Sequence, residues 1–588
     1  MNRNEIDRYT FNPTNVDMSR SKIRIPHRTL TSFNVGELVP VDAFEVLPGD
    51  TWNMKTSLVA RLQPLVTPVM DNLYLDHYWF FVPYRLIYDH WENLQGQNDT
   101  DFWTETREYT VPQINLKDDN GEFTSVKEGT LLDYFGIPAN ITPFNYSVSA
   151  LPTRAYCKIC NDWFVDENLV TPLQFDTGDA NINYGSPTRN LDSYVTDCVK
   201  GGYPFTSAKL HDLFTSCLPS PQKGPEVNVN VGDLAPVIPT PYQFIFDSAD
   251  TQQSKLYGLS RFTEFAEVVS DPRPGVFGHT YDGVDRNLFS SGANNSGALT
   301  FATPKSGAGV DSIHPIFNNL GADLKDATGV SINELRELFA VQRYYEKLAR
   351  GGSRYIEILK SLFGVTSPDA RLQRSEYLGG SRTPISITQV TQTSSTNSQP
   401  SPLGDVAGQS VTNDSRDGFV KSFVEHGIVI CLATVRYKHT YTRGVPKMFK
   451  RKSKFDFYLP QFANIGEMPV FEDEIYLIDQ SEDTDIQNDS VFGYQEAWAN
   501  GYRYLPDRTT SEMSPLSSNS LSNWHFADNY STPPTLGSAW IREDKTNVDR
   551  TLAVTSSVSN QVFADFYFDC SATRVMPLFS IPGLIDHH

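Results

Sequence analysis

The chain has 588 residues, 39% of them hydrophobic and 12% aromatic, and it carries a formal net charge of −21. No segment approaches the roughly 20 consecutive apolar residues that a membrane-spanning helix requires. The acidic balance argues against a protein that binds nucleic acid over its whole surface. The aromatic content, with 37 Pro and 37 Gly spread along the sequence, favours many short strands joined by ordered loops over an array of helices.

Residues 1–50 are predicted to form an extended N-terminal arm. Prolines at positions 13, 26, 40 and 48 exclude a long helix there, and the first residues contain no apolar region typical of a secretion signal. A small basic cluster makes this arm a candidate for contact with nucleic acid. Its candidate residues are Arg20, Lys22, Arg24 and Arg28.

Residues 51–225 are predicted to contain strands with inserted loops and short helices. The aromatic run over residues 73–82, which stops at a proline, indicates a buried strand. Helical spacing or a glycine cap marks several short helices. These are predicted over residues 84–94, 131–136 and 162–169.

Residues 226–328 differ from the rest and are interpreted as an insertion in a larger fold. Valine and asparagine alternate over residues 227–231, which predicts a strand. A proline-rich stretch follows. Small polar segments at residues 290–297 and 306–309 are typical of exposed loop tips.

Residues 329–588 contain the clearest helix and then return to strands. Ser331 and Glu334 match a capping box at the start of a helix that should end at a glycine pair, residues 351–352. The other elements predicted here are a helix over residues 353–363 and a strand over residues 428–441.

The strongest charge feature is the segment 436–454, in which cations alternate with aromatic residues and no acidic residue occurs. Cations that follow phosphates and rings that stack on bases are what single-stranded nucleic acid requires. The alternative is a solvated basic loop, or a partner for acidic neighbours in an assembly. The candidate DNA-contact residues are Arg436, Lys438, Arg443, Lys447, Lys450, Arg451, Lys452 and Lys454.

Motifs for chemistry are weak or missing. Cys157 and Cys160 form a CxxC, but without a second pair they indicate two buried thiols and no zinc site. The six cysteines are too few for a disulfide framework in this length and indicate a reducing compartment. The glycine pairs match no phosphate-binding loop, and the histidines show no metal-ligand spacing. The sequence gives no reason to expect a catalytic residue, a metal or a cofactor.

Several long, irregular strings are spread from the first hundred residues to the last ten. They are LDHYWFFVPYRL at 75–86, LPSPQKG at 218–224, RGGSRYIE at 350–357, FGVTSPDARLQR at 363–374, FGYQE at 492–496 and SIPGLIDH at 580–587. In this order they resemble the major capsid proteins of the gokushovirus branch of the Microviridae. The resemblance covers nearly the whole chain except residues 226–328.

The resemblance implies a mainly β fold, an eight-stranded antiparallel jelly roll with long loop insertions that carry short helices. Residues 51–225 and 329–588 would be the two parts of this shell domain, the second with a C-terminal extension. Sixty copies would close a T=1 icosahedral shell around a circular single-stranded DNA phage genome. The implied location is the virion, after assembly in the cytoplasm of the host bacterium.

The window 226–328 would then be the variable insertion that forms protrusions at the threefold axes. Exposed, variable tips are suitable places for attachment to a host receptor. The candidate attachment residues are Gly292, Asn294, Asn295, Gly297 and Lys305. Other implied partners are a small basic DNA-packaging protein and the internal scaffolding and pilot proteins that act during assembly.

Two hypotheses from other classes remain. A β-sandwich attachment protein or glycan-binding spike of a phage would explain the aromatic residues and loops, but it would form trimers or pentamers and not a closed shell. An enzyme such as a glycoside hydrolase would need two carboxylates at a defined separation, and the sequence does not point to such a pair.

Overall fold

In the computed structural model, the described residues are 20–97, 108–190, 193–225, 227, 332–352, 354–393, 403–479 and 490–578, with the backbone of short strands between residues 237 and 322. The chain divides into two compact units. One comprises Met1–Gly224 and Tyr345–His588, and the other comprises Pro225–Tyr344. Among the described residues, no helix has both the length and the apolar character needed to cross a bilayer.

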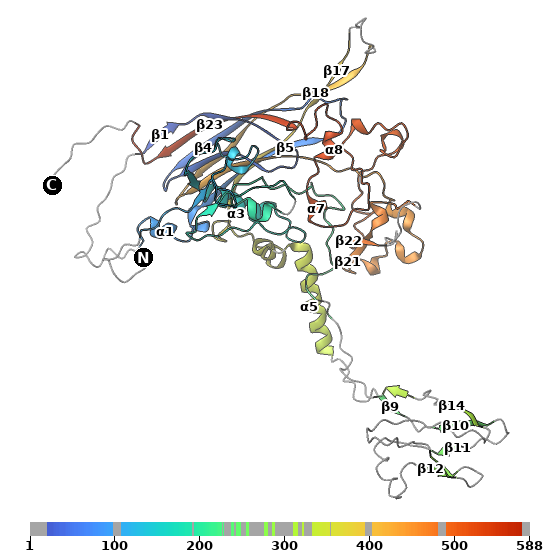
Figure 1. Ribbon diagram of the computed structural model, residues 1–588. Helices are drawn as coiled ribbons and strands as arrows, with labels where there is room; N and C mark the ends of the chain where they lie inside the picture. The colour runs from blue at the N-terminus through green and yellow to red at the C-terminus, as the bar shows by residue number, and fades with distance from the viewer. Residues whose placement is uncertain are drawn as a thin grey trace, which may run out of the picture. The chain divides into compact units, whose positions relative to one another are not determined.

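The first large sheet is antiparallel and combines strands from both ends of the chain (Figure 1). Its central strand β23 pairs with β4 on one side and with β1 and β2 on the other, and β4 pairs in turn with β19. The strands are β1 (Ser21–Arg24), β2 (His27–Phe33), β4 (Thr51–Leu62), β19 (Thr412–Ser422) and β23 (Val562–Arg574).

The second large sheet is also antiparallel and has the order β16-β5-β20-β3. Its strands are β3 (Val39–Val46), β5 (Leu73–Pro83), β16 (Glu376–Pro384) and β20 (Gly427–Tyr437). The strands β5 and β20 confirm the predictions for residues 73–82 and 428–441, although β20 ends four residues before Tyr441.

The main hydrophobic core lies between these two sheets. Along β4, Trp52, Met54, Leu58 and Ala60 are buried, whereas Lys55 and Val59, which lie between them, are exposed. This alternation follows from the period of two in a strand with one covered face. The same pattern on β23 places Phe566 and Phe568 in the core, and the ring of Phe568 packs on Trp79 of β5.

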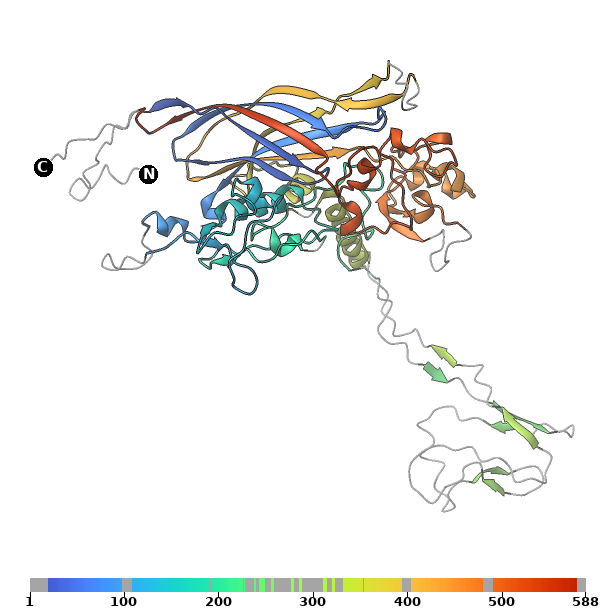
Figure 2. The same cartoon turned by 45° about the horizontal axis from the view of Figure 1, so that its top comes forward.

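A second core covers the other face of the β5–β20 sheet. Phe80 and Val82 of β5 and Ile430 of β20 point away from the first core and pack on α3 (Leu151–Ile159). The described body therefore has three layers, two sheets and a layer of short helices and loops, which Figure 2 shows below the sheets. Because β5 and β20 are covered on both faces, they need nearly continuous apolar sequences.

Short elements between the strands complete the first unit. Before the insertion they are η2 (Tyr84–Leu86), α1 (Trp91–Leu94), β6 (Gln113–Asn115), α2 (Leu131–Tyr134), β7 (Ser147–Ser149), the π-helix η3 (Cys160–Phe164), β8 (Ile182–Asn183) and α4 (Tyr194–Asp197). After it they are α6 (Tyr355–Ile358), the π-helix η5 (Leu359–Phe363), β17 (Ile387–Thr391), β18 (Val406–Ser410), η6 (Lys447–Lys450), η7 (Lys454–Asp456), η8 (Pro460–Phe462), β21 (Glu467–Phe471), η9 (Glu472–Glu474), β22 (Val491–Glu496), η10 (Ser511–Met513), η11 (Ser522–Trp524), α7 (Ser538–Ile541) and α8 (Thr546–Asp549).

The second unit contains the window 226–328, and its described residues before α5 form short strands. The helix α5 (Ile332–Gly351) begins in this unit and ends in the first one. The strands are β9 (Val237–Pro239), β10 (Gln243–Ser248), β11 (Lys255–Tyr257), β12 (Val276–His279), β13 (Asp285–Asn287), β14 (Val310–His314) and β15 (Leu320–Ala322). The strand predicted over residues 227–231 lies, except for its first residue, outside the described residues.

Three local predictions need correction. From Ser21 onward, the segment expected as an extended arm supplies β1, β2 and β3 to the two sheets, because its alternating apolar residues reach the core at Phe33. The helix predicted over residues 162–169 instead spans Leu151 to Phe164 as α3 and η3. The segment 84–94 forms two short helices.

Other helix predictions are confirmed. The helix α5 ends at Gly351, and Gly352 follows with φ +88°, a left-handed conformation that favours glycine. The predicted partner in its capping box, Ser331, lies outside the described residues. The short helix before Gly364 is also present, with Gly364 in the left-handed conformation. The single turn over residues 131–136 is α2, followed by Gly136.

Replacement of Trp79 tests the core between the sheets. Its ring is fully buried and lies 5.5 Å from the rings of Phe419 and Phe568. We expect Trp79→Ala to lower the free energy of unfolding by about 3–5 kcal/mol, because it removes a large side chain and leaves a cavity. Urea denaturation of the unassembled subunit measures this. The matched control is Tyr567→Ala on the exposed face of β23, with an expected loss of about 1 kcal/mol or less. Equal losses would contradict this assignment.

Candidate functional site

The first part of the basic segment 436–454 is bound into the fold. Arg436 at the end of β20 contacts the buried carboxylate of Asp76, which also accepts a hydrogen bond from Arg382 at 2.8 Å. Burial raises the pKa of Asp76, but the hydrogen bonds and charges of the two guanidinium groups outweigh burial and hold it below its usual range. Lys438 forms an ion pair with Asp507 at 2.5 Å. Arg436 is therefore a partner of Asp76 within the subunit, and its contact with DNA stays a prediction.

The middle of the segment is held by an acidic turn. Lys447 forms an ion pair with Glu474 at 2.6 Å, and Lys450 pairs with Asp473 of the same 3-10 helix, η9. Both ammonium groups also lie over the ring of Phe471, at 4.8 and 4.2 Å from its centroid. These two cations are neutralised inside the subunit and have little charge left for a phosphate.

The remaining cations of the segment differ in environment. Arg443 stacks over the ring of Tyr476 at 4.0 Å, and Arg451 stacks over Tyr502 at 4.1 Å. Lys452 and Lys454 are exposed, and within the described part of the chain no carboxylate lies at ion-pair distance from either ammonium group. Of the predicted contacts in this segment, these two lysines have the most available charge.

The cations of the N-terminal segment lie on the exposed face of the first sheet. Strand alternation places Lys22, Arg24 and Arg28 outward. Arg24 forms an ion pair with Asp569 at 2.9 Å, and Arg28 lies 3.9 Å from Asp565, both on the neighbouring β23. These surface pairs are exposed and weak. The structure brings these three together on one face, and Arg20, which directly precedes β1, is also exposed.

The other predicted positions fall into two groups. Cys157 and Cys160 are fully buried in α3 and η3, where burial raises the pKa of both thiols. Among the residues described, no group of three or more His, Cys, Asp or Glu side chains is arranged to hold a metal. The candidate attachment residues lie outside the described residues, namely Gly292, Asn294, Asn295, Gly297 and Lys305.

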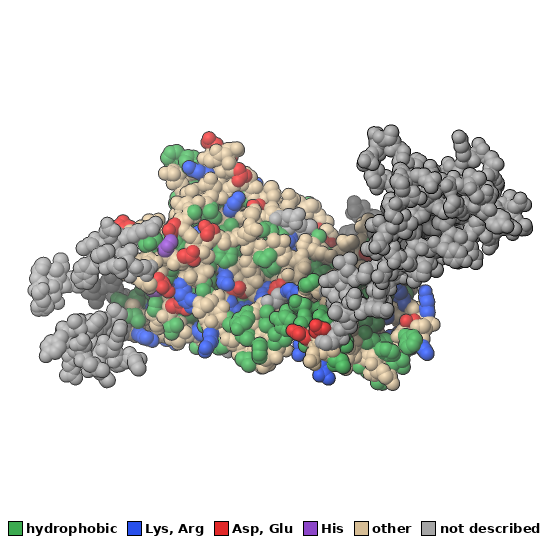
Figure 3. Space-filling view, turned by 90° about the horizontal axis from the view of Figure 1, so that it is seen from below, with side chains coloured by type: hydrophobic (Ala, Val, Ile, Leu, Met, Phe, Trp, Pro, Cys, Tyr) green, Lys and Arg blue, Asp and Glu red, His purple; other side chains and the backbone are tan. Residues whose placement is uncertain are grey.

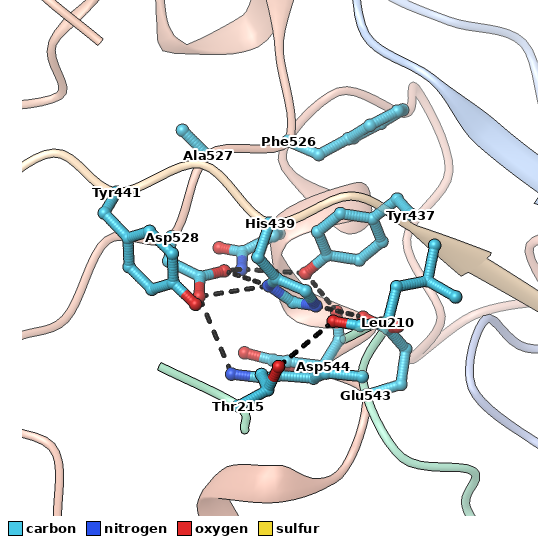
Figure 4. Close-up of polar contacts among 12 residues, drawn as sticks. Leu210, Thr215, Tyr437, His439, Tyr441, Phe526, Ala527, Asp528, Glu543 and Asp544 are labelled. Atoms are coloured by element: carbon cyan, nitrogen blue, oxygen red, sulfur yellow. Dashed lines mark hydrogen bonds and ion pairs between the residues drawn. The ribbon is translucent and has the colours of Figure 1, made fainter. Parts of the chain in front are cut away.

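A buried polar cluster around His439 was not predicted (Figure 4). Nδ1 of His439 lies 2.9 Å from Oδ1 of Asp528, and Nε2 lies 2.9 Å from Oε1 of Glu543. Asp528 also accepts hydrogen bonds from Tyr530 at 2.6 Å and Asn547 at 2.7 Å. The side chains of His439, Asp528 and Glu543 are all buried. The cluster joins the segment after β20 to residues 525–549.

Both ring nitrogens of His439 face carboxylates, so the imidazole is held as the cation. Burial lowers its pKa, but the charges of Asp528 and Glu543 outweigh burial and raise the pKa from 6.5 to about 9. The charge of His439, with that of Lys209 at 3.6 Å, holds the pKa of Asp528 well below its usual range despite burial. Because neither ring nitrogen is free to accept a proton, His439 cannot act here as a general base. The cluster has a structural role and is here called the His439 joint, because it connects the segment after β20 to residues 525–549.

Only part of the His439 joint could be predicted from the sequence. His439 lies in the predicted alternation with Val435, Tyr437 and Tyr441, which is a sign of a buried position. A buried histidine needs partners for its ring nitrogens. The partners, however, come 89 and 104 residues later in the chain, in irregular loops. Only the tertiary structure identifies them.

Replacement of His439 tests the joint. We expect His439→Gln to lower the free energy of unfolding by about 3–5 kcal/mol, because the two buried carboxylates lose the cation that lies between them. The raised pKa also fixes the pH dependence. The stabilisation from His439 is fully present below pH 6.5 and is lost as the pH rises through about 9. Urea denaturation of the unassembled subunit over this range should show the decline in the wild type and a weaker decline in the variant.

The matched control is His211→Gln, since His211 is exposed and its replacement should change the free energy of unfolding by about 0.5 kcal/mol or less. Equal pH dependence in the His439 variant and the wild type would contradict the proposed charge state.

Comparisons with known proteins agree with one another along the whole chain. The family model described as "Capsid protein (F protein)" matches residues 13–584. The chain is 39% identical to capsid protein VP1 of Spiroplasma virus 4 over 96% of this chain and 95% of that protein. It is 36% identical to capsid protein VP1 of Chlamydia phage 1, over 98% of each chain, and 35% identical to that of Bdellovibrio phage phiMH2K, over 97% and 96%. These matches confirm the resemblance to gokushovirus capsid proteins: the chain belongs to the F-type capsid protein family of the Microviridae.

Proposed function

We propose that sixty copies of this capsid protein close into a T=1 icosahedral shell around the circular single-stranded DNA genome of a phage. The observation that carries the proposal is the match, over at least 95% of each chain, to relatives that are each named capsid protein VP1. A shell requires large interfaces between copies, and obligate interfaces commonly bury about 2,000 Å² or more. The long insertions of the first unit are the proposed source of that interface area.

The shell domain is, in this proposal, an eight-stranded jelly roll. Taking β1 and β2 as one bent strand, the two four-stranded sheets have the orders β2-β23-β4-β19 and β3-β20-β5-β16. Consecutive strands of these sheets alternate between the two, except for β5 and β16, which pair within one sheet. The sheets pack face to face over one core. Both features support a jelly roll, the double-sheet architecture found in capsid domains.

The second unit, Pro225–Tyr344, is proposed as the surface protrusion near the threefold axes that contributes to host attachment. Its support is that this part of the chain forms a unit of its own. Its glycine- and asparagine-rich sequence also suits exposed segments, where binding residues are common. The proposed ligand is a receptor on the host surface.

The exposed face of the first sheet is the proposed DNA contact. Lys22, Arg24 and Arg28 share this face, and exposed Arg20 directly precedes β1. The two carboxylates that pair with Arg24 and Arg28 are partly exposed, so phosphates can compete for the guanidinium groups. Lys447 and Lys450, by contrast, are held by Glu474 and Asp473. Because the subunit is acidic overall, a small basic packaging protein would supply further charge, and internal scaffolding and pilot proteins would act during assembly in the host cytoplasm before the virion is complete.

Expression of the chain tests the shell. We expect purified protein, with scaffolding protein where closure needs it, to form closed particles in analytical ultracentrifugation and negative-stain microscopy. The reason is that the subunit's insertions are complementary to neighbouring copies. The alternative, a phage attachment or glycan-binding spike, would give trimers or pentamers under the same conditions. Discrete small oligomers or stable monomers would contradict the shell.

Replacement of the sheet-face cations tests the DNA contact. We expect Lys22→Ala with Arg28→Ala to lower the DNA content per particle, because two phosphate-neutralising charges are lost. The ratio of absorbance at 260 and 280 nm measures DNA content. The matched control is Lys360→Ala with Arg371→Ala, which removes the same charge at exposed positions outside the two large sheets. Equal DNA content in the sheet-face variant and the wild type would overturn the assignment.

A further inference from the structure

We propose that an exposed aromatic surface around residues 448–465 docks on an acidic, apolar surface around residues 118–146 of a second copy of this chain. The inference rests on the proposed shell and adds the two faces that meet in one of its interfaces. Both surfaces belong to the first unit, and they lie in different parts of it, the cyan-blue and the orange segments of Figure 2.

The first surface, here called the aromatic patch, consists of large apolar side chains that the isolated subunit leaves in solvent. Phe449 is 70% exposed and Leu505 is 77% exposed. Soluble monomers rarely expose continuous apolar patches of more than a few hundred Å². The patch residues are Met448, Phe449, Phe455, Phe457, Tyr458, Phe462, Ile465, Tyr502, Tyr504 and Leu505. The view from below shows hydrophobic side chains gathered on the described surface, with Lys and Arg side chains at their edges (Figure 3).

Contacts within the aromatic patch hold it in one shape. Tyr458 packs edge to face on Trp498 at 5.7 Å, and its backbone N–H donates to the hydroxyl of Tyr502 at 3.1 Å. Nε1 of Trp498 donates to the carbonyl of Phe462 at 2.7 Å. Phe455 packs edge to face on Phe462 at 5.9 Å. The exposed rings are therefore preorganised, which reduces the entropy lost when a partner binds.

Charge on the aromatic patch is positive, although the chain is acidic. Lys452 and Lys454 lie within it, and no carboxylate of the described residues is at ion-pair distance from either. The nearby carboxylate of Asp456 accepts hydrogen bonds from the backbone N–H groups of Lys452 and Ser453. An acidic surface on a partner would provide carboxylates that pair with these two ammonium groups.

The second surface, here called the acidic patch, has the complementary character. Asp118 holds its own turn by accepting backbone hydrogen bonds from Asn120 and Glu122, each at 2.9 Å. The side chains of Asp119 and Glu122 are exposed, and no cation of the described residues is at ion-pair distance from them.

Apolar side chains adjoin these carboxylates. Phe144, 88% exposed, packs on Phe123 at 5.2 Å next to the acidic turn. Ile141 and Tyr146 are also exposed. The acidic patch therefore offers two carboxylates beside an apolar surface, which matches two ammonium groups beside aromatic rings.

A second copy fits the aromatic patch better than nucleic acid does. Met448, Ile465 and Leu505 are aliphatic and give bases no ring to stack on, and Phe455 and Tyr458 are already packed edge to face. Apolar contact with a few ion pairs at the edge is the composition of protein interfaces. Because the two faces differ, the contact is head-to-tail, and repeated head-to-tail contacts with a closing rotation form rings.

Charge reversal tests the pairing. We expect Lys452→Glu with Lys454→Glu to reduce the yield of closed particles at least tenfold, and Asp119→Lys with Glu122→Lys to do the same, because like charges then meet in the interface. All four substitutions in one chain should restore most of the yield, since every contact again joins opposite charges. Particle yield is measured by sedimentation and negative-stain microscopy. Failure of the quadruple variant to recover, or normal yield of each double variant, would overturn the pairing.

The control variant Lys360→Glu with Arg371→Glu changes the net charge equally at exposed positions outside both patches, and it should assemble with wild-type yield. A drop as large as that of the Lys452 and Lys454 variant would mean a general charge effect and would overturn the proposal. If the Lys452 and Lys454 variant formed normal particles with reduced DNA content, the aromatic patch would be a contact with the genome. That result would also overturn the proposal. Absence of particles from wild-type protein would instead refute the proposed shell.

Cross-linking of wild-type particles tests the contact without relying on the folding of a variant. A carbodiimide joins a lysine to a carboxylate only when the two are in direct contact. We expect mass spectrometry to find peptides with Lys452 or Lys454 joined to peptides with Asp119 or Glu122, in particles and not in unassembled subunits. Cross-links from these lysines solely to other carboxylates would overturn the pairing.

Discussion

The sheet of β16, β5, β20 and β3 is covered on both faces, and the rest of the first unit depends on this constraint. One face packs on the sheet that contains β23 and the other packs on α3 and the loops around it. At about 25 cal/mol per Å² of apolar area, two covered faces stabilise a strand far more than one. The long insertions are therefore bound to the sheet through a hydrophobic core, and they present their outer surfaces in fixed positions.

Internal carboxylates determine which cations are available to partners. Asp76 holds Arg436, and Glu474 and Asp473 hold Lys447 and Lys450. In a chain of net charge −21, a run of basic residues in the sequence is thus not a basic surface in the fold. What remains for a partner is a smaller set of exposed charges, and an assembly of like-charged copies needs such local positive sites to avoid repulsion.

The cluster at His439 shows how distant loops are fixed at the end of a strand. Its charged groups are buried and are paired by residues from three separate segments of the chain. A buried ion pair is weak evidence for stability but is costly to break. The cluster therefore fixes the arrangement of the loops more than it increases the stability of the subunit, and loop arrangement is what an interface between copies requires.

The sequence by itself determined the family, the β class, the buried strands β5 and β20 and the helix α5, because these depend on local periodicity and on strings that relatives share. It placed one short helix wrongly, at residues 162–169, and it assigned as an arm a segment that supplies β1 to β3. Only the tertiary structure decided the pairing of strands from both chain ends and the neutralisation of Lys447. The physical reason is that charge, burial and strand partners depend on residues far apart in the chain, whose distances no local pattern contains.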